Sequence, residues 1–313
     1  MRVLVTGADG FVGARLVRRL VHDGHRVSGS VRPGAAAARA LPEGVMAVPL
    51  ELTDRASVAR ALEPPYEAVV HLAAVASGGD ARRDPGEAWT VNAAGTARLA
   101  DALAAGRDRT GTDPLLLVAS SAEVYGNAGG NRARTEADPP APCSPYAASK
   151  WGAEIAALEV HRRVGLRVAV TRAFPHTGVG QDDRFVVPAF ARRIRLAREV
   201  GAPVVEVGNL EPVRDFLHVD DVVDAYVRLL ERAQSGAVYN IASGEGVSIG
   251  DVFVKLARLL DAKVVPETDS RLVRASDIRH LVGDARKLRE ATGWAPRHTL
   301  DDALREVIGA ETD

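Results

Sequence analysis

Cysteine is almost absent from this sequence, since Cys143 is the only one in 313 residues. A lone cysteine excludes an intrachain disulfide, and the His/Cys spacing of a zinc site is also missing, so we expect no metal. An excess of either charge is lacking as well, because 40 basic and 41 acidic residues are mixed along the chain and leave a net charge of −1. This balance argues against a nucleic-acid partner and against a membrane-surface partner.

A hydrophobic run long enough to cross a bilayer, about 20 residues, is missing too. Residues 1–7 lead directly into a predicted strand and a glycine turn, so we expect no signal peptide and a cytoplasmic location. The chain does have length and apolar content. Its 46% hydrophobic residues over 313 positions are enough for about two domains with a sizeable core.

The N-terminal stretch has the pattern of a dinucleotide site. Residues 2–6 form a short apolar run with β-branched side chains, a glycine turn follows, and helical periodicity begins after it. A strand, a glycine turn and a helix N-terminus together present backbone N–H groups to a phosphate. The spacing is GxxGxxG, and an ordinary glycine-rich turn is the alternative. The predicted cofactor contacts here are Gly7, Gly10, Phe11, Val12 and Gly13.

The second predicted strand, 25–31, favours NADP(H) over NAD(H). NAD sites usually carry an acidic residue at the end of this strand, whereas a 2′-phosphate needs a cation. Here the strand ends in Ser-Gly-Ser-Val and is followed by Arg32, which is otherwise a solvated loop charge. Further along, Asp54 either caps the next helix or accepts a bond from the adenine amine. Leu72, Ala73 and Ala74, which directly follow the fourth predicted strand, are further predicted cofactor contacts.

A polar turn follows the apolar run 115–119, which has the character of a strand buried on both faces of a parallel sheet. Ligands bind beyond the carboxyl ends of such strands. Ser121 therefore has the position to place a hydroxyl beside a substrate oxygen, and Glu123 is the only carboxylate in the turn. The alternative for both is turn chemistry, in which these side chains bond to nearby backbone.

Tyr146 and Lys150 lie four residues apart in a predicted helix and so share one face. A free tyrosine has a pKa of about 10, and a nearby ammonium lowers that pKa toward neutrality. This pair is suited to proton transfer. The alternative is a surface tyrosine that packs on the methylene groups of the lysine side chain.

Arginines dominate the second half of the chain. Most of those in the predicted helix 185–200 belong to a solvated face. Arg214, Arg271 and Arg274 are candidates for gripping a diphosphate, because arginine binds phosphate oxygens bidentately. A plain surface charge is the alternative for each.

Taken in order, these motifs resemble the extended short-chain dehydrogenase/reductase family, whose members act on nucleotide sugars. The resemblance covers nearly the whole chain and rests on the glycine turn, 121–126, Tyr146 with Lys150, 214–222 and 238–244. It implies an α/β fold, a Rossmann-type doubly wound parallel sheet with a smaller C-terminal α/β substrate domain. We expect residues 1–172 together with about 215–241 to form the NADP-binding domain. Residues 173–214 together with 242–313 are expected to form the nucleotide-sugar-binding domain.

The resemblance also implies roles. Tyr146 is the acid/base, Lys150 lowers its pKa and binds the nicotinamide ribose, and Ser121 holds the reacting oxygen. In relatives that eliminate water, a glutamate in the place of Glu123 is a base and an aspartate often stands where this chain has Ala122. Elimination is therefore less expected. Relatives dimerise through the helices matching 85–105 and 145–163, which implies a homodimer.

The second half resembles most the reductases that act on GDP-4-keto-6-deoxy-mannose, so a GDP-linked sugar is the expected substrate. A GDP-mannose-type 4,6-dehydratase and a C4 epimerase or ketoreductase on a UDP- or dTDP-sugar stay open. Pro175 stands where these relatives usually have asparagine, and Ala275 stands where they commonly have proline. The identity of the nucleotide base in the substrate is therefore open as well. The implied substrate contacts are Ser121, His176, Asn209, Arg214, Arg274 and Asp277.

Overall fold

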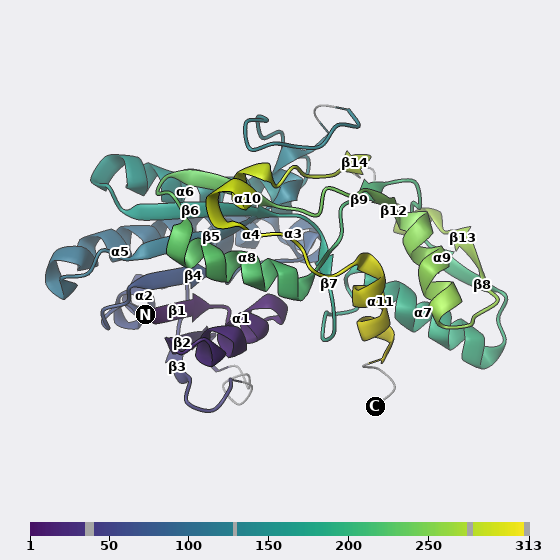
Figure 1. Cartoon of the computed structure of the whole chain (residues 1–313), viewed down its shortest axis with the longest axis horizontal. Helices are drawn as coiled ribbons and strands as arrows, with labels where there is room; N and C mark the ends of the chain where they lie inside the picture. The colour runs from purple at the N-terminus through teal and green to yellow at the C-terminus, as the bar shows by residue number, and fades with distance from the viewer. Residues whose placement is uncertain (35–40, 128–129, 274–277, 310–313) are drawn as a thin grey trace.

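The computed structural model describes residues 1–34, 41–127, 130–273 and 278–309 (Figure 1). Two predicted substrate contacts, Arg274 and Asp277, lie outside these ranges. A large sheet with helices on both faces makes up one part of the molecule, and a smaller assembly of helices and short strands makes up the other (Figure 1). The α/β fold class predicted from the sequence is confirmed.

Seven parallel strands form the large sheet in the order β11-β6-β5-β4-β1-β2-β3. The strand order reverses between β1 and β4, and that switch point is where open α/β sheets bind their ligands. The strands are Arg2–Thr6 (β1), Arg26–Val31 (β2), Met46–Pro49 (β3), Ala68–His71 (β4), Leu115–Ser121 (β5), Arg167–Ala173 (β6) and Ala237–Ile241 (β11).

Helices cover both faces of this sheet. α1 (Phe11–His22) packs beside α8 (Val219–Arg232) on one face, and their buried residues share a core cluster with β1 and β11. α2 (Arg55–Ala61), α5 (Gly95–Thr110) and α6 (Pro145–Val164) bury their apolar residues in a second cluster. Because both faces are covered, β4 is buried along its whole length, as parallel sheets require.

The starts of two helices follow from local sequence. Asp54 caps α2 by accepting hydrogen bonds from the N–H groups of Ala56 and Ser57. Ser144 caps α6 in the same way, with a proline in the first turn. Both residues satisfy N–H groups that have no partner within the helix. α6 then ends at Gly165, whose φ of 71° is the left-handed conformation that glycine adopts readily.

The helix predicted over 85–105 is not continuous. It consists of α4 (Pro85–Ala88), a π-helical turn η2 (Trp89–Ala94) and α5, with the short helix α3 (Gly78–Arg83) before it. Single π-helical turns are uncommon and concentrate at functional sites. Here the turn carries Asn92, which is 2% exposed.

The smaller part lies to the right in Figure 1 and has its own core cluster, built chiefly from α7, α9 and α11. Its short strands form two sheets, β12-β9-β14 and β13-β8, while β10 pairs with β7. The elements are β7 (His176–Thr177), α7 (Val186–Val200), β8 (Val204–Val207), β9 (Val213–Arg214), β10 (Leu217–His218), β12 (Val247–Ser248), α9 (Ile249–Leu259), β13 (Val265–Thr268), β14 (His280–Leu281) and α11 (Leu300–Gly309), with a 3₁₀ turn η4 (Ser270–Leu272). Another 3₁₀ turn, η3 (Ala122–Tyr125), directly follows β5 of the large sheet.

Two later segments return to the large sheet. β11 pairs in parallel with β6 at the sheet edge. α10 (Arg286–Thr292) packs on α8 and β11, so Leu281, Leu288 and Trp294 belong to the core cluster of the large sheet. The chain therefore crosses several times between the two parts.

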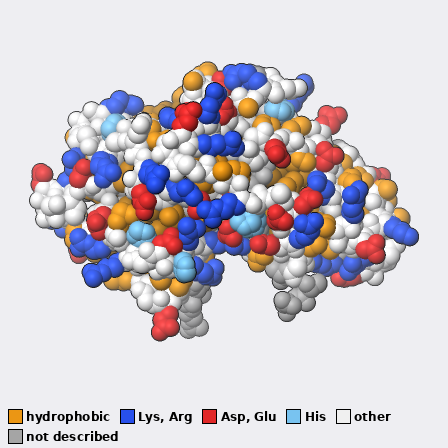
Figure 2. Space-filling view, viewed as in Figure 1, with side chains coloured by type: hydrophobic (Ala, Val, Ile, Leu, Met, Phe, Trp, Pro, Cys, Tyr) orange, Lys and Arg blue, Asp and Glu red, His pale blue; other side chains and the backbone are white. Residues whose placement is uncertain are grey.

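The surface carries both signs of charge. Figure 2 shows Lys and Arg side chains interspersed with Asp and Glu over the visible face. Among the described helices, none is both long and apolar enough to span a membrane.

Candidate active site

The glycine turn lies at the switch point and is shaped by close backbone contacts. Gly7 has a φ of +66°, and a Cβ there would lie 2.9 Å from the N atom of Ala73. A Cβ on Gly13 would lie 2.0 Å from the carbonyl oxygen of Gly7. Side chains are thus excluded where a diphosphate has to approach backbone, and this cradle fits a dinucleotide.

The buried hydroxyl of Thr6 joins the end of β1 to the exit of β4. Its Oγ1 accepts hydrogen bonds from the N–H groups of Leu72 and Ala73, each at 3.1 Å, and bonds to His71 Nδ1 at 2.8 Å. Burial, together with the Lys150 charge, lowers the pKa of His71 to about 3. His71 is therefore neutral and structural at physiological pH.

At the end of β2, the Ser30 hydroxyl accepts a hydrogen bond from the N–H of Gly7 at 3.3 Å. Arg32 is exposed, and its charge is one cause of the lowered pKa of Glu51, after the backbone hydrogen bond from Thr53. Asp54 acts as the α2 cap, which is one of the two roles considered for it.

Ser121, Glu123 and Tyr146 come together beyond the carboxyl end of β5. The Ser121 hydroxyl and the Glu123 charge both lie close enough to the Tyr146 phenol to act on its pKa. Ser121 also accepts a hydrogen bond from the Glu123 N–H at 3.2 Å. One turn further along α6, Lys150 is 7% exposed and its Nζ donates to the carbonyl oxygen of Ala119 at 2.6 Å. The structure thus brings together all four residues predicted as catalytic.

The electrostatics of Tyr146 differ from the sequence-based expectation. Burial raises the pKa of Tyr146, and the Glu123 charge raises it further, whereas the Ser121 hydrogen bond lowers it. Burial also lowers the pKa of Lys150 to about 8. The expectation that Lys150 makes the phenol more acidic is wrong for the net direction, because desolvation of the phenolate is the largest cause of the shift and the Lys150 charge is not among its causes. Tyr146 is therefore a protonated phenol at neutral pH and able to donate its proton.

Asn92, in the π-helical turn η2, braces this site. Its Oδ1 accepts from the Val75 N–H at 2.8 Å, and its Nδ2 donates to the Ser149 hydroxyl at 2.9 Å. Ser149 in turn donates to the carbonyl oxygen of Tyr146 at 2.9 Å. The π-helical turn therefore holds the first turn of α6.

A buried ion pair behind the site was missed by the sequence reasoning. Glu154 and Arg172 are 2% and 5% exposed, and the guanidinium binds the carboxylate through Nε at 3.0 Å and Nη2 at 2.8 Å. Ser120 donates to the same carboxylate at 2.5 Å, and Arg172 lies over the ring of Tyr125. The available signal was the spacing of Glu154, four residues after Lys150 on the same helix face.

The predicted substrate contacts are distributed over several elements. The His176 ring stacks on Phe11 with 6.2 Å between centroids, so it lies against the glycine turn. Asn209 accepts a hydrogen bond from the N–H of Glu211 in the turn after β8. Arg214 lies on β9 and donates to the carbonyl oxygen of Ile278 at 2.6 Å. Within the described ranges, no cluster of His, Cys, Asp or Glu has the grouping of a metal site.

Comparison with known proteins gives a consistent result. The model of the NAD dependent epimerase/dehydratase family matches residues 3–242. The GDP-6-deoxy-D-mannose reductase of Pseudomonas aeruginosa is 34% identical over 311 residues, which cover 98% of this chain and 96% of that protein.

Two solved structures show the same fold, and the family follows from these matches. RMD from Pseudomonas aeruginosa complexed with NADPH has a TM-score of 0.84 at 32% identity and covers 99% of this chain and 98% of its own. The UDP-glucose 4-epimerase of Thermus thermophilus in complex with NAD has a TM-score of 0.86 at 30% identity, with coverages of 99% and 98%. This protein therefore belongs to the NAD dependent epimerase/dehydratase family and is an NAD(P)-dependent enzyme of nucleotide sugars.

Proposed function

We propose that the protein is an NADPH-dependent 4-ketoreductase of a nucleotide-linked 4-keto-6-deoxy sugar, with GDP as the nucleotide. The observation that carries this proposal is that the Ser121 hydroxyl, at the end of β5, lies close to the Tyr146 phenol at the start of α6, with Lys150 one helical turn further along. The similarity to a GDP-6-deoxy-D-mannose reductase supports the choice of substrate.

Each residue has a defined task in this reaction. Ser121 donates a hydrogen bond to the C4 carbonyl oxygen and fixes its position. Tyr146, kept protonated by burial, donates its proton to that oxygen as negative charge develops on it. Lys150 keeps positive charge beside the phenol and the ribose. The nicotinamide, when bound, supplies the hydride to C4.

The cofactor is proposed to be NADP(H). Arg32 is the exposed cation after β2, where a 2′-phosphate needs one, and the strand has no acidic residue at its end. One similar structure contains NADPH and another contains NAD, so the family itself uses both. Binding of NADPH and NADH to the purified protein, followed by protein fluorescence, tests this choice directly.

The nucleotide sugar is proposed to bind between the two parts of the chain, 1–172 plus 215–241 and 173–214 plus 242–313. A homodimer through η2 and α6 is also proposed. It is supported by Trp89 and Ile155, which are 47% and 48% exposed on these neighbouring helices. Light scattering coupled to gel filtration gives the mass, and a monomer at micromolar concentration would contradict the dimer.

The decisive test is NADPH oxidation with purified GDP-4-keto-6-deoxy-mannose, followed by the loss of NADPH absorbance. We expect turnover by the wild type and a loss of at least about a hundredfold in kcat for Tyr146→Phe, because general acid catalysis contributes about 10²–10⁴-fold. Tyr66→Phe, a buried tyrosine remote from the cluster, is the matched control. Absence of NADPH consumption, or full activity of Tyr146→Phe, would refute the proposal.

A 4,6-dehydratase is the second candidate, because the Glu123 charge lies close enough to act on Tyr146. A dehydratase recycles its cofactor, so GDP-mannose alone would yield ketone without added NADPH. A C4 epimerase would interconvert UDP- or dTDP-sugars without net cofactor use. Each assay needs only the purified protein and one sugar nucleotide.

A further inference from the structure

The carboxylate of Glu154 holds the end of β5 from the side of α6. It accepts the Ser120 hydroxyl at 2.5 Å and the Arg172 guanidinium through Nε at 3.0 Å and Nη2 at 2.8 Å. Ser120 and Arg172 are direct partners in the register of β5 with β6, so this one carboxylate joins both strands to the helix. In β5, Ser120 lies between Ala119 and Ser121.

Lys150 attaches the same helix to the same strand end, one residue earlier. Its Nζ donates to the carbonyl oxygen of Ala119 at 2.6 Å. Lys150 and Glu154 lie four residues apart on α6 and so share one face, where they are 7% and 2% exposed. α6 is therefore fixed to β5 at two consecutive residues, and Ser121, with its hydroxyl in the site, is the next residue of the strand.

Glu154 also carries the charge that supports the Lys150 ammonium. Burial lowers the pKa of Lys150, and the Glu154 charge partly offsets this effect. Of the other titratable groups around the site, His71 on β4 is neutral and Tyr146 on α6 is a protonated phenol, on which Glu123 of η3 acts. The carboxylate that acts on Lys150 thus lies on its own helix, one turn further along.

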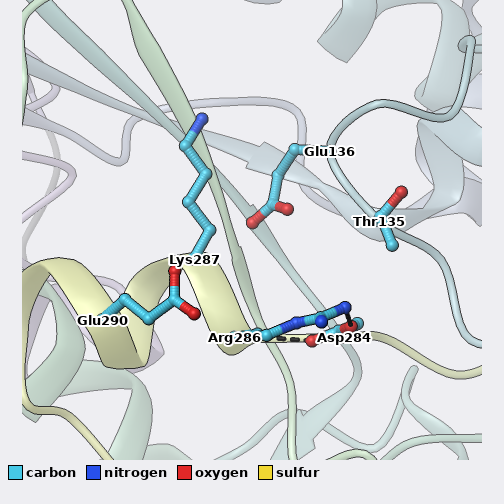
Figure 3. Close-up of a pocket in the computed structure, with 6 residues that line it drawn as sticks. All are labelled: Thr135, Glu136, Asp284, Arg286, Lys287 and Glu290. Carbon is cyan, nitrogen blue, oxygen red and sulfur yellow. Dashed lines mark hydrogen bonds and ion pairs between the residues drawn. The ribbon is translucent and has the colours of Figure 1, made fainter.

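Arg172 holds the Glu154 carboxylate in place from β6. Its guanidinium lies over the ring of Tyr125, 4.8 Å from the centroid, and the Tyr125 hydroxyl donates to Asn240 Oδ1 at 2.6 Å. The N–H of Asn240 donates in turn to Glu136 at 2.7 Å, and Glu136 lines a surface pocket of about 270 Å³ (Figure 3). The buried pair is therefore the inner end of a polar chain that reaches the surface, and the guanidinium is held on both sides.

We propose that Glu154 is a positioning residue of the reaction and that its carboxylate acts through Lys150 and Ser121. Through Ser120, it fixes the strand end from which the Ser121 hydroxyl extends. Through its negative charge, it keeps the Lys150 side chain as an ammonium against the Ala119 carbonyl. The proposal rests on the proposed function for the roles of Ser121 and Lys150.

The pH dependence of unfolding tests the effect on Lys150 without any substrate. In the wild type, the rise in stability caused by Lys150 begins near its folded-state pKa of about 8. Glu154→Gln/Arg172→Met removes the supporting carboxylate without leaving a buried guanidinium unpaired, so the rise should begin at least about half a pH unit lower. Arg172→Met, which keeps the carboxylate, should show no such downward shift. A merely structural ion pair would change the stability at every pH and leave the onset of the rise in place.

The chain offers a matched control on the same helix. Glu159 and Arg163 also form an ion pair on α6, but these side chains are 50% and 48% exposed. Glu159→Gln/Arg163→Met should therefore keep the wild-type onset. Glu154→Asp retains a carboxylate and should return the onset toward that of the wild type. Glu154→Gln alone gives the same comparison if the double variant does not fold.

Steady-state kinetics with NADPH and a 4-keto sugar nucleotide test the effect on the reaction. At about pH 7, Glu154→Gln/Arg172→Met should lose at least about tenfold in kcat while the KM for the sugar changes by less than about threefold, because Glu154 orients catalytic groups and does not bind the substrate. The Glu159→Gln/Arg163→Met control should keep its kcat within about twofold of the wild type.

The outcomes separate this inference from the proposed reductase. If the double variant keeps the wild-type onset of the stability rise, or keeps the wild-type kcat, the inference is refuted and the reductase is unaffected. A lowered onset and a lowered kcat, both partly restored in Glu154→Asp, support the inference. If the wild type reduces no 4-keto sugar, the reductase is refuted, and the onset of the stability rise alone then decides the inference.

Discussion

Replacing Arg172 by methionine should destabilise the protein strongly. The guanidinium hydrogen-bonds the carboxylate of Glu154 through Nε and Nη2, and the two side chains are only 6% and 2% exposed. After the substitution, a buried carboxylate keeps only the hydroxyl of Ser120 as a side-chain partner among these groups. Breaking a buried ion pair on one side typically costs about 3–5 kcal/mol, because the remaining charge is desolvated and unpaired.

The magnitude can be checked by urea and thermal unfolding. For a chain of this size, a loss of about 3–5 kcal/mol corresponds to a decrease in melting temperature on the order of 10 °C. Arg305→Met removes one partner of an exposed ion pair with Asp302 and should change the stability by less than about 1 kcal/mol. This pair is the matched control, since it differs from the buried pair mainly in exposure.

The double variant Glu154→Gln/Arg172→Met separates an unpaired charge from lost packing. It removes both charges, so we expect it to be more stable than Arg172→Met alone. The reasoning would be refuted if Arg172→Met lost less than about 1 kcal/mol, or if the double variant were less stable than the single one. Either result would mean that the pair contributes mainly through packing.

Three other substitutions test separate parts of the structure. Gly13→Ala places a Cβ 2.0 Å from a backbone oxygen and should abolish NADPH binding, whereas Gly106→Ala, in an open position of α5, should bind normally and be up to about 1 kcal/mol more stable. Burial lowers the pKa of Lys150 to about 8, whereas the pKa of a lysine in an unfolded chain is about 10.4. Between these two pH values the unfolded chain still binds a proton at Lys150 that the folded protein has lost. Stability should rise with pH through that window by roughly 3 kcal/mol, and unfolding measured from about pH 7 to 10.5 should show this rise in the wild type and not in Lys150→Met. Asn92→Leu should lower kcat more than it raises the KM for NADPH, because the first turn of α6 loses its brace; equal kinetics in the two proteins would contradict this role.

Local patterns were sufficient for much of the fold. The strands β1 and β5 lie where the apolar runs at 2–6 and 115–119 predict them, because strands buried on both faces of a parallel sheet are continuously apolar. The glycine turn and the capped helix of Tyr146 and Lys150 depend on contacts between residues close in sequence, and such contacts can be predicted without the tertiary structure.

Other features depend on segments far apart in the chain. The 85–105 helix contains a π-helical turn whose Asn92 bonds to Val75 and to Ser149 of α6, which no local periodicity reports. His176 lies on Phe11 although they belong to opposite halves of the sequence. Local spacing can place two residues on one helix face, but it contains no information about what a different element brings to that face.

The amino-acid sequence by itself determined the α/β class, the glycine turn after β1 and the placement of Tyr146 and Lys150 one turn apart on a helix, since each depends on short-range spacing. Only the tertiary structure decided the charge state of these groups. Burial keeps Tyr146 protonated and lowers the pKa of Lys150. Desolvation depends on everything that surrounds a group, and in a folded chain most of those atoms come from distant residues.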